Sequence, residues 1–169
     1  MATTLPRTTT LAGDTVAALK VAMRGSVIQP DDPTYDEARA VYNAMIDKRP
    51  ALIARCADVA DVMAAVNVAR DHGLRVAVRG GRHNGSGLGS VDNGLVIDLS
   101  PMNGVRVDPV HRTARVEGGA TLADLHHATA AFGLATPSGI ISTTGVGGIT
   151  LGGGIGHLTR QCGLAIDNV

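Results

Sequence analysis

The sequence contains very few aromatic residues, which make up 2% of its 169 residues and include no tryptophan. A hydrophobic core must therefore consist of aliphatic side chains, and the overall hydrophobic content of 44% is enough to supply one. Fifteen basic residues balance fifteen acidic residues, so the formal net charge is zero. This balance gives no electrostatic reason to expect nucleic acid or an anionic membrane as a partner.

Long apolar runs are also missing from the chain. No segment approaches the ~20 apolar residues of a membrane-spanning helix, and the N-terminal segment lacks the apolar centre of a secretion signal. The two cysteines, Cys56 and Cys162, have no CxxC spacing and could either pair or stay reduced. We expect a cytoplasmic protein with reduced thiols and no membrane partner.

Three common ligand-binding patterns are absent from the sequence. It has no GxGxxG fingerprint of dinucleotide-binding folds and no Gly-Lys-Ser/Thr of a phosphate-binding loop. No group of His, Cys, Asp or Glu has the spacing of a zinc site, and the adjacent His126 and His127 diverge on a predicted helix. We therefore expect no metal centre.

The apolar periodicity that is present predicts alternating helices and strands. The predicted helices cover residues 11–23, 35–47, 59–72 and 121–132. The predicted strands cover residues 51–55, 75–79, 95–99, 104–107 and 113–117. The order predicts an α+β fold of two lobes, one a small parallel βαβ unit and the other mainly antiparallel with helices.

Two of the predicted helices have a clear expected inner face. In the helix that Asp58 and Asp61 cap, the inward residues are Val59, Val62, Val66 and Ala69. In the helix over 35–47, the inward residues are Ala38, Val41, Met45 and Ile46. Thr121 and Asp124 have the spacing of a capping box at the start of the last helix.

Glycine is abundant, with 22 residues concentrated between Gly80 and Gly163. The loop Arg79-Gly80-Gly81-Arg82-His83-Asn84 follows a predicted strand, and its backbone N–H groups could form a concave anion site flanked by two arginines. A plain surface loop is an equal alternative for this segment alone.

A second glycine-rich stretch covers residues 142–157 and mixes glycine with apolar residues and threonine. So much glycine costs conformational entropy on folding, which a flat ligand packed against bare backbone would explain. A tight contact between a helix and a sheet is the alternative. Only His83 and His157 lie within the glycine-rich segments, and a neutral imidazole is a competent nucleophile.

Taken together, these segments resemble the FAD-binding domain of the vanillyl-alcohol oxidase/p-cresol methylhydroxylase superfamily, and most of all its berberine-bridge-enzyme-like branch. The resemblance runs from near Gly25 to Val169. It rests on the ordered segments YDEAR, RGGRHN, GLVIDLS, VEGGATLADL, GLATPSG, STTGVGGITLGGGIGHLTR and GLAIDNV. The resemblance implies a helical N-terminal segment over residues 1–45 and a PCMH-type FAD-binding domain over residues 46–169.

The resemblance also implies roles for individual residues. His83 matches the histidine that is joined to the 8α-methyl carbon of the flavin ring, and the loop around it would hold the FAD pyrophosphate through backbone donors. Further residues would contact the cofactor. The implied FAD site comprises Arg79, Gly80, Gly81, Arg82, His83, Asn84, Thr143, Thr144, Gly145, Gly147, Gly148, Gly153, Gly154, His157, Asp167 and Val169.

Three departures from the family pattern refine these expectations. Arg82 stands where the family has glycine, so its side chain must stay outside the phosphate site. Ile141 stands where doubly linked relatives have a second attachment cysteine, which favours a single covalent link. Cys162 lies too far downstream for that role and is expected to be a structural thiol. The third departure is length, because relatives continue beyond the position of Val169 into a substrate domain and a catalytic base.

The sequence therefore predicts the FAD-binding part of a flavin-linked oxidoreductase. We expect oxidation of an alcohol, sugar or amine, with oxygen or another electron acceptor, in a longer protein that contains the substrate domain. Thr144 matches the position that gates oxygen in the family. Two alternatives remain: an FAD- or nucleotide-binding module that is inactive by itself, and a flavoprotein with the same fold and no covalent link.

Overall fold

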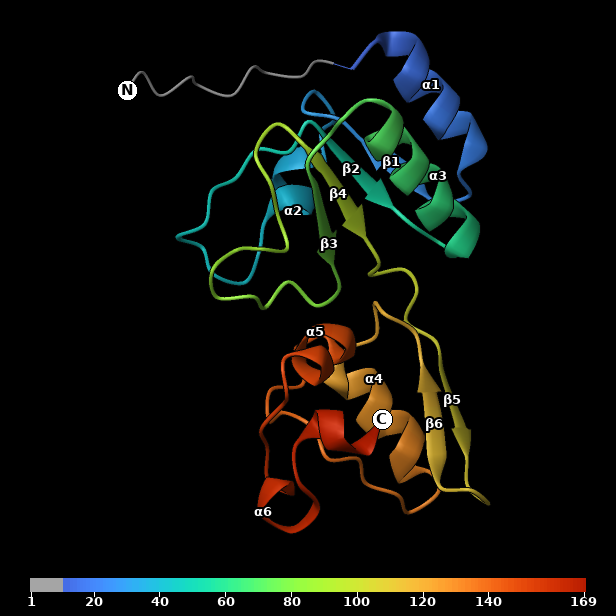
Figure 1. Ribbon diagram of the computed structural model, residues 1–169, viewed down its shortest axis with the longest axis vertical. Helices are drawn as coiled ribbons and strands as arrows, with labels where there is room; N and C mark the ends of the chain where they lie inside the picture. The colour runs from blue at the N-terminus through green and yellow to red at the C-terminus, as the bar shows by residue number, and fades with distance from the viewer. Residues whose placement is uncertain (1–10) are drawn as a thin grey trace.

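A computed structural model describes residues 11–169, and these residues form two lobes that follow one another along the longest axis (Figure 1). The first lobe holds a four-stranded sheet in the order β1-β2-β4-β3. The second holds a two-stranded sheet, β5-β6, with short helices. This arrangement confirms the α+β fold of two lobes. The strands are β1 Ser26–Ile28, β2 Leu52–Arg55, β3 Val76–Arg79, β4 Leu95–Asp98, β5 Val105–Asp108 and β6 Thr113–Val116.

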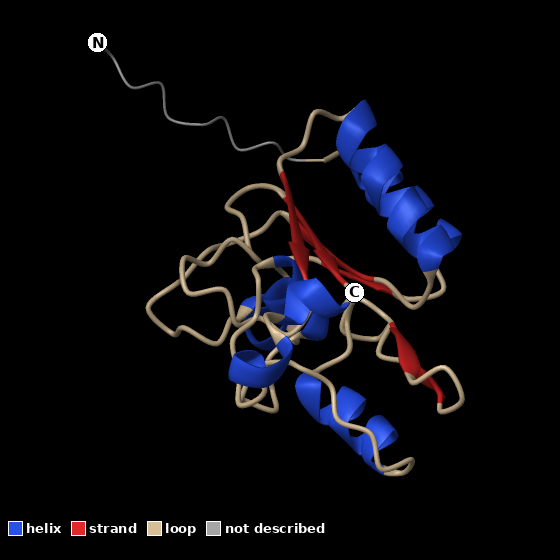
Figure 2. Cartoon of the chain, turned by 60° about the horizontal axis from the view of Figure 1, so that its bottom comes forward, coloured by secondary structure: helices blue, strands red, loops and turns tan. Residues whose placement is uncertain are grey.

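The sheet of the first lobe is parallel at its centre, where β4 lies between β2 and β3. β1 adds an antiparallel edge strand beside β2. The sequence did not predict this strand, because three residues between Gly25 and Pro30 are too few to show an apolar pattern. α1 (Gly13–Ala22) and α3 (Val59–Asp71) pack together on one face of the sheet (Figures 1 and 2). The division of the chain at residue 45 stays a prediction.

β4 is buried on both of its faces, which explains why it is an apolar run without alternation, whereas Val76 and Val78 of β3 are exposed. On the helix side, Leu52, Ala54, Leu95 and Ile97 form the main core with α1 and α3. On the opposite face, the smaller cluster around Ile53 and Val96 is covered by Tyr35 and Ala38 of α2 (Tyr35–Arg39).

The predicted helix over 35–47 is wrong beyond Arg39, where α2 ends. Instead of continuing the helix, the Tyr42 N–H donates to the carbonyl of Arg82, and the guanidinium of Arg39 pairs with Asp47. These long-range partners override the helical periodicity of the segment. Met45 is consequently exposed rather than inward-facing.

The predicted inner face of α3 is also partly wrong, because Val59 and Val66 are exposed. The buried residues are Asp61, Ala65 and Ala69. Asp58 does cap the helix and accepts from the Asp61 N–H, as predicted. The Asp61 carboxylate, however, accepts from the backbone N–H groups of Arg24, Gly25 and Ala57, which joins the corner after α1 to α3.

In the second lobe, the predicted hairpin and the helix after it are confirmed. β5 and β6 pair antiparallel, and Thr121 and Asp124 form the predicted capping box. The glycine-rich stretch contains α5, a short helix that composition gave no reason to expect. The helical elements of this lobe are α4 Leu122–Ala130, α5 Val146–Leu151, α6 Thr159–Cys162 and the 3-10 helix η1 Ala165–Asn168. Within residues 11–169, no helix has the length and apolar character to span a membrane.

Candidate functional site

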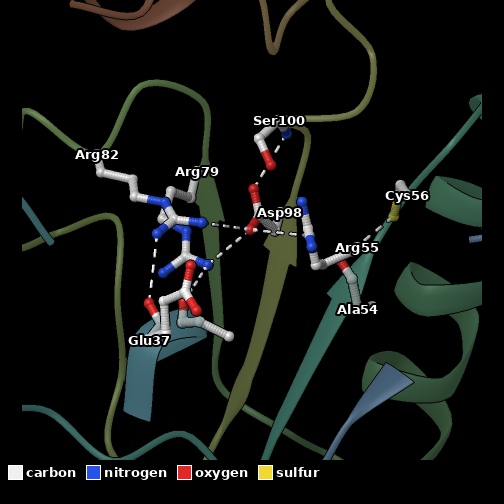
Figure 3. A network of polar contacts seen from close by, with 9 residues as sticks. Glu37, Ala54, Arg55, Cys56, Arg79, Arg82, Asp98 and Ser100 are labelled. Atoms are coloured by element: carbon white, nitrogen blue, oxygen red, sulfur yellow. Dashed lines mark hydrogen bonds and ion pairs between the residues drawn. The ribbon is translucent and has the colours of Figure 1, made fainter. Parts of the chain in front are cut away.

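The carboxyl ends of the three parallel strands carry a row of charged residues. Arg55, Asp98 and Arg79 are the last residues of β2, β4 and β3, and the strand register places them side by side. Figure 3 shows the arginines converging on the carboxylate of Asp98. Arg79 donates to it at 2.7 Å, and Arg55 lies 4.0 Å from the same oxygen. Open α/β sheets commonly bind ligands at this edge, so the row marks the side of the lobe at which a ligand site is expected.

The Arg79–Asp98 pair is completely buried, with both side chains at 0% exposure. Burial alone would raise the pKa of Asp98, but the positive charge and hydrogen bond of Arg79 hold it below its usual value. The same burial lowers the pKa of Arg79. Arg79 also donates to the carbonyl of Ala38, at the end of α2. Its guanidinium is therefore committed inside the first lobe and does not face an anion in the loop, contrary to the prediction from sequence.

Arg82 occupies the position where the family has glycine, and it adopts a positive φ of 65°. Its guanidinium turns back to the first lobe, where it lies 3.4 Å from Asp98 and 3.5 Å from the carbonyl of Glu37 (Figure 3). The loop thus keeps the left-handed backbone that glycine allows. The side chain points away from the loop's backbone donors, as the sequence predicts.

The two glycine-rich segments meet where the lobes join. A methyl group on Gly81 would collide with the backbone nitrogen of Gly145, and one on Gly145 would collide with Gly81. A methyl group on Gly80 would lie 2.7 Å from the carbonyl oxygen of Gly118. Some of the glycines are therefore needed because two backbone segments pack tightly together. This is similar to the alternative given above for residues 142–157, a tight contact between a helix and a sheet. At Gly148, by contrast, nothing lies within reach of an added methyl group.

His83 belongs to the first glycine-rich segment, and its imidazole contacts the second. Its Nε2 is 2.9 Å from the hydroxyl of Thr143, and its Nδ1 is 3.5 Å from the hydroxyl of Thr144. The ring of Tyr42 stacks on the imidazole with a centroid distance of 4.0 Å and an interplanar angle of 20°. Two hydroxyls and one aromatic face thus fix the ring's orientation, while part of the side chain remains accessible.

The backbone around His83 offers unused donors. Within residues 11–169, the N–H groups from Gly80 to Asn84 donate to no acceptor. The Asn84 side chain accepts from the Leu88 N–H and so closes the turn that follows. Consecutive free N–H groups in a loop are the donor set that an anion such as a diphosphate requires.

The remaining predicted site residues lie in the second lobe. Gly153 and Gly154 have positive φ values of 102° and 72°, and their carbonyls accept from η1. Asp167 accepts from the Leu164 N–H, whereas His157 is exposed. Gly147 and Val169 line one groove of about 940 Å³ between the hairpin, α4 and η1. The structure thus joins residues 143–148 both to the His83 loop and to the chain's last residues.

Two residues of this arrangement were not predicted from the sequence. Tyr42 lies in a segment predicted to be helical, so its stacking on His83 had no local sequence signal. Asp98 did have one, because an acidic residue at the end of the buried strand LVID requires a partner. Cys162 is exposed rather than packed as a structural thiol, and Cys56 and Cys162 are both free.

Comparison with known proteins gives consistent matches. Residues 50–169 match the model of a protein family described as an FAD binding domain. Over 152 residues, the chain is 40% identical to (R)-6-hydroxynicotine oxidase of Paenarthrobacter nicotinovorans, covering 90% of this chain and 33% of that enzyme. Over 128 residues, it is 44% identical to an FAD-linked oxidoreductase of Dictyostelium discoideum, covering 76% of this chain and 28% of that protein. The chain spans about a third of the length of these curated relatives.

Solved structures give the same picture. The structure of 6-hydroxy-D-nicotine oxidase from Arthrobacter nicotinovorans matches with a TM-score of 0.85 and 40% identity, covering 87% of this chain and 32% of that one. The grass pollen allergen Phl p 4, described as having glucose dehydrogenase activity, matches with a TM-score of 0.82 and 31% identity, covering 91% of this chain and 34% of that one. A Phl p 4 variant with one isoleucine changed to valine is described as a glucose oxidase.

Proposed function

The chain belongs to the family of FAD-binding domains of FAD-linked oxidoreductases, and from this premise we propose that His83 carries the flavin through a single covalent bond. The observation that supports this most is the position of the imidazole. It extends from the first glycine-rich segment to the second, with its ring held by Thr143 and Tyr42 and still accessible. A neutral imidazole in a fixed orientation is a suitable nucleophile.

The described residues fit a flavin nucleotide. The free N–H groups from Gly80 to Asn84 suit its diphosphate, and the open space at Gly148 allows a flat ring to approach bare backbone. When bound, FAD accepts a hydride from the substrate and passes the electrons to an acceptor. The residues proposed to hold it are Arg79, Gly80, Gly81, Arg82, His83, Asn84, Thr143, Thr144, Gly145, Gly147, Gly148, Gly153, Gly154, His157, Asp167 and Val169. Of these, Arg79 would act by holding the start of the loop in place, because its side chain is buried against Asp98 and its carbonyl accepts from the Leu99 N–H.

Peptide mapping tests the covalent bond and its number. Trypsin places His83 in the peptide 83–106 and Cys56 in the peptide 56–70, while cleavage after Arg160 releases Cys162 separately. In protein expressed from its complete gene, we expect the flavin mass on peptide 83–106 alone. The His83→Ala variant should bind FAD without a covalent bond, so denaturing the protein should release the cofactor. Flavin on a cysteine peptide would contradict the single link, and protein that takes up no FAD would contradict the function itself.

The electron acceptor of the whole protein is proposed to be oxygen, with Thr144 controlling its access. In Phl p 4, one change from isoleucine to the smaller valine accompanies the description as an oxidase. Thr144 has nearly the size of valine, and its hydroxyl has a partner in His83 at 3.5 Å. We expect the reduced flavin to react rapidly with oxygen, and Thr144→Ile to slow this step about tenfold or more, whereas Thr144→Val should not. Rapid-mixing absorbance measurements distinguish these outcomes.

The substrate is proposed to be an alcohol, a sugar or an amine. The named relatives include a 6-hydroxynicotine oxidase and a protein with glucose dehydrogenase activity. A second candidate function, FAD binding without turnover, is favoured for the 169-residue chain by itself, because it spans only a third of those relatives. Expressing residues 1–169 alone and assaying both FAD uptake and substrate-driven bleaching of the flavin separates binding from catalysis.

A further inference from the structure

We propose that Asp98 is a positioning residue for His83, acting through Arg79 and Arg82. The proposal rests on the proposed function of His83 as the flavin attachment site. It assigns a task to a buried charge that neither cofactor contact nor core packing explains. Replacing a buried ion pair with apolar side chains is often neutral or stabilising, so the pair is not explained by stability alone.

Asp98 is itself held firmly in place. It ends β4 at the centre of the sheet and is 0% exposed. Its Oδ1 accepts from the Ser100 N–H at 3.0 Å, while the next residue, Leu99, donates its N–H to the carbonyl of Arg79. The second oxygen, Oδ2, is the one that faces Arg79 and Arg82. The carboxylate is therefore a fixed reference point for both arginines.

Arg79 connects this point to one side of the imidazole. The same terminal nitrogen that bonds to Asp98 donates to the carbonyl of Ala38, 2.7 Å away. The chain then leaves α2 and reaches Tyr42, whose N–H donates to the carbonyl of Arg82 and whose ring stacks on His83. Movement of Arg79 would therefore shift the segment that supports the imidazole.

Arg82 connects the same point to the backbone immediately before His83. Its positive φ of 65° is unfavourable for a residue with a side chain, so the conformation needs external support. The 3.4 Å contact with Asp98 and the 3.5 Å contact with Glu37 provide that support. Without the negative charge, Arg79 would be buried beside Arg55 and Arg82 with no counter-charge, and the loop would have to rearrange.

Proton NMR of His83 tests the proposal without any flavin. The stacked ring of Tyr42 shifts the imidazole protons upfield, and Tyr42→Ala in the apoprotein measures the size of that shift. We expect Asp98→Asn, which keeps the shape and removes the charge, to lose at least half of it. The matched control is Asp36→Asn, which changes an exposed carboxylate on α2 in the same way and should leave the shift intact.

The rate of covalent attachment is the second readout. On adding FAD to the apoprotein expressed from its complete gene, we expect Asp98→Asn to attach flavin about tenfold more slowly or worse, because small misplacements of reacting groups have effects of this size. Total FAD binding should change less. Wild-type shift and rate in Asp98→Asn would overturn the proposal. If that variant does not fold, Arg82→Gln decides, since an unchanged shift and rate there would overturn it equally. If the wild-type protein bound no FAD, the proposed function would be wrong. The NMR measurement would still show whether Asp98 holds His83 in position, because it does not require flavin.

Discussion

The two lobes differ in how completely they bury their apolar residues. In the first lobe, the sheet residues Ile53, Leu95 and Val96 are fully buried, and the two central strands have a buried cluster on each face. In the second lobe, the hairpin has two edge strands, and only a few apolar residues such as Leu122 and Leu125 are buried. Leu151, Ile155 and Val169 are exposed there, and Leu151 and Val169 line a groove of about 940 Å³.

This difference separates two tasks. The first lobe is a well-packed scaffold that fixes His83 from one side through Asp98, Arg79 and the segment around Tyr42. The second lobe supplies the threonines and glycines that meet His83 from the other side, with fewer buried contacts of its own. Binding segments commonly have lower local stability than the core that positions them. Substitutions should therefore act mainly on stability in the first lobe and mainly on ligand binding in the second.

A matched pair of isoleucines gives the largest expected contrast. Ile97→Ala removes a side chain that is 1% exposed at the centre of the sheet and should lower the free energy of unfolding by about 2–5 kcal/mol. Ile155→Ala acts at a position that is 74% exposed and should change it by about 0.5 kcal/mol or less. Urea denaturation followed by circular dichroism measures both. Equal effects would show that the second lobe is as well packed as the first.

The next effect concerns Asp61, which joins α3 to the corner before β1. Burial alone would raise its pKa, but three backbone N–H donors hold the pKa below the usual value. Asp61→Asn loses part of this set and should lower stability at pH 7 by about 1–3 kcal/mol. Because the folded-state pKa is depressed, the stabilisation is present above the unfolded-state pKa of about 3.9 and is lost as the pH falls through the folded value.

Denaturation of wild type and Asp61→Asn at several pH values checks this prediction. The difference in unfolding free energy between the two proteins should be largest near neutral pH and should decrease below about pH 4. If this difference did not depend on pH, the negative charge of Asp61 would not be the source of the stabilisation by the backbone N–H donors.

At the junction between the lobes, adding a single methyl group should destabilise the protein. Gly81→Ala places a methyl group against the backbone of Gly145, so the two segments must separate, at a cost of about 1–3 kcal/mol. FAD affinity should fall as well, because His83 would move away from Thr143. Gly85→Ala is the control, since nothing lies within reach of its methyl group. Fluorescence titration with FAD and thermal melting measure both variants. If Gly81→Ala had the same FAD affinity and melting temperature as Gly85→Ala, the junction would tolerate the methyl group and the prediction would be wrong.

The smallest effect concerns the thiols. Burial raises the pKa of Cys56 to about 12, with help from nearby carboxylates, so it should not react while the first lobe is folded. Cys162 is exposed in the second lobe and should react readily. A thiol reagent at pH 8 should therefore modify one cysteine quickly, and the second only in denaturant. Rapid modification of both would mean that the first lobe opens in the native state. Cys162→Ser should change stability by about 0.5 kcal/mol or less.

Elements with strong local patterns were predicted correctly from the sequence. β2, β3 and β4 are apolar runs, and Asp58 and Thr121 begin their helices with side-chain caps. Elements that depend on distant partners were not. β1 is three residues long and exists because it pairs with β2, and α5 forms despite two glycines.

The candidate site divides in the same way. The glycine-rich loop, His83 and the segment around Thr143 could be identified from sequence, because their order along the chain matches a family pattern. That pattern says nothing of the packing that supports them. The stacking of Tyr42 and the direction of Arg79 depend on contacts between residues about forty positions apart, which no local periodicity encodes.

By itself, then, the amino-acid sequence determined the family, the two-lobe α+β class and the loop that carries His83, because caps, apolar runs and glycine-rich motifs act over short distances. Only the tertiary structure decided that α2 stops at Arg39, that Asp61 replaces Val59 and Val66 on the buried face of α3, and that Arg79 faces Asp98 instead of a ligand. A buried charge or backbone donor must find its partner wherever the fold brings one within reach. That requirement outweighs the small local preferences from which sequence patterns are read.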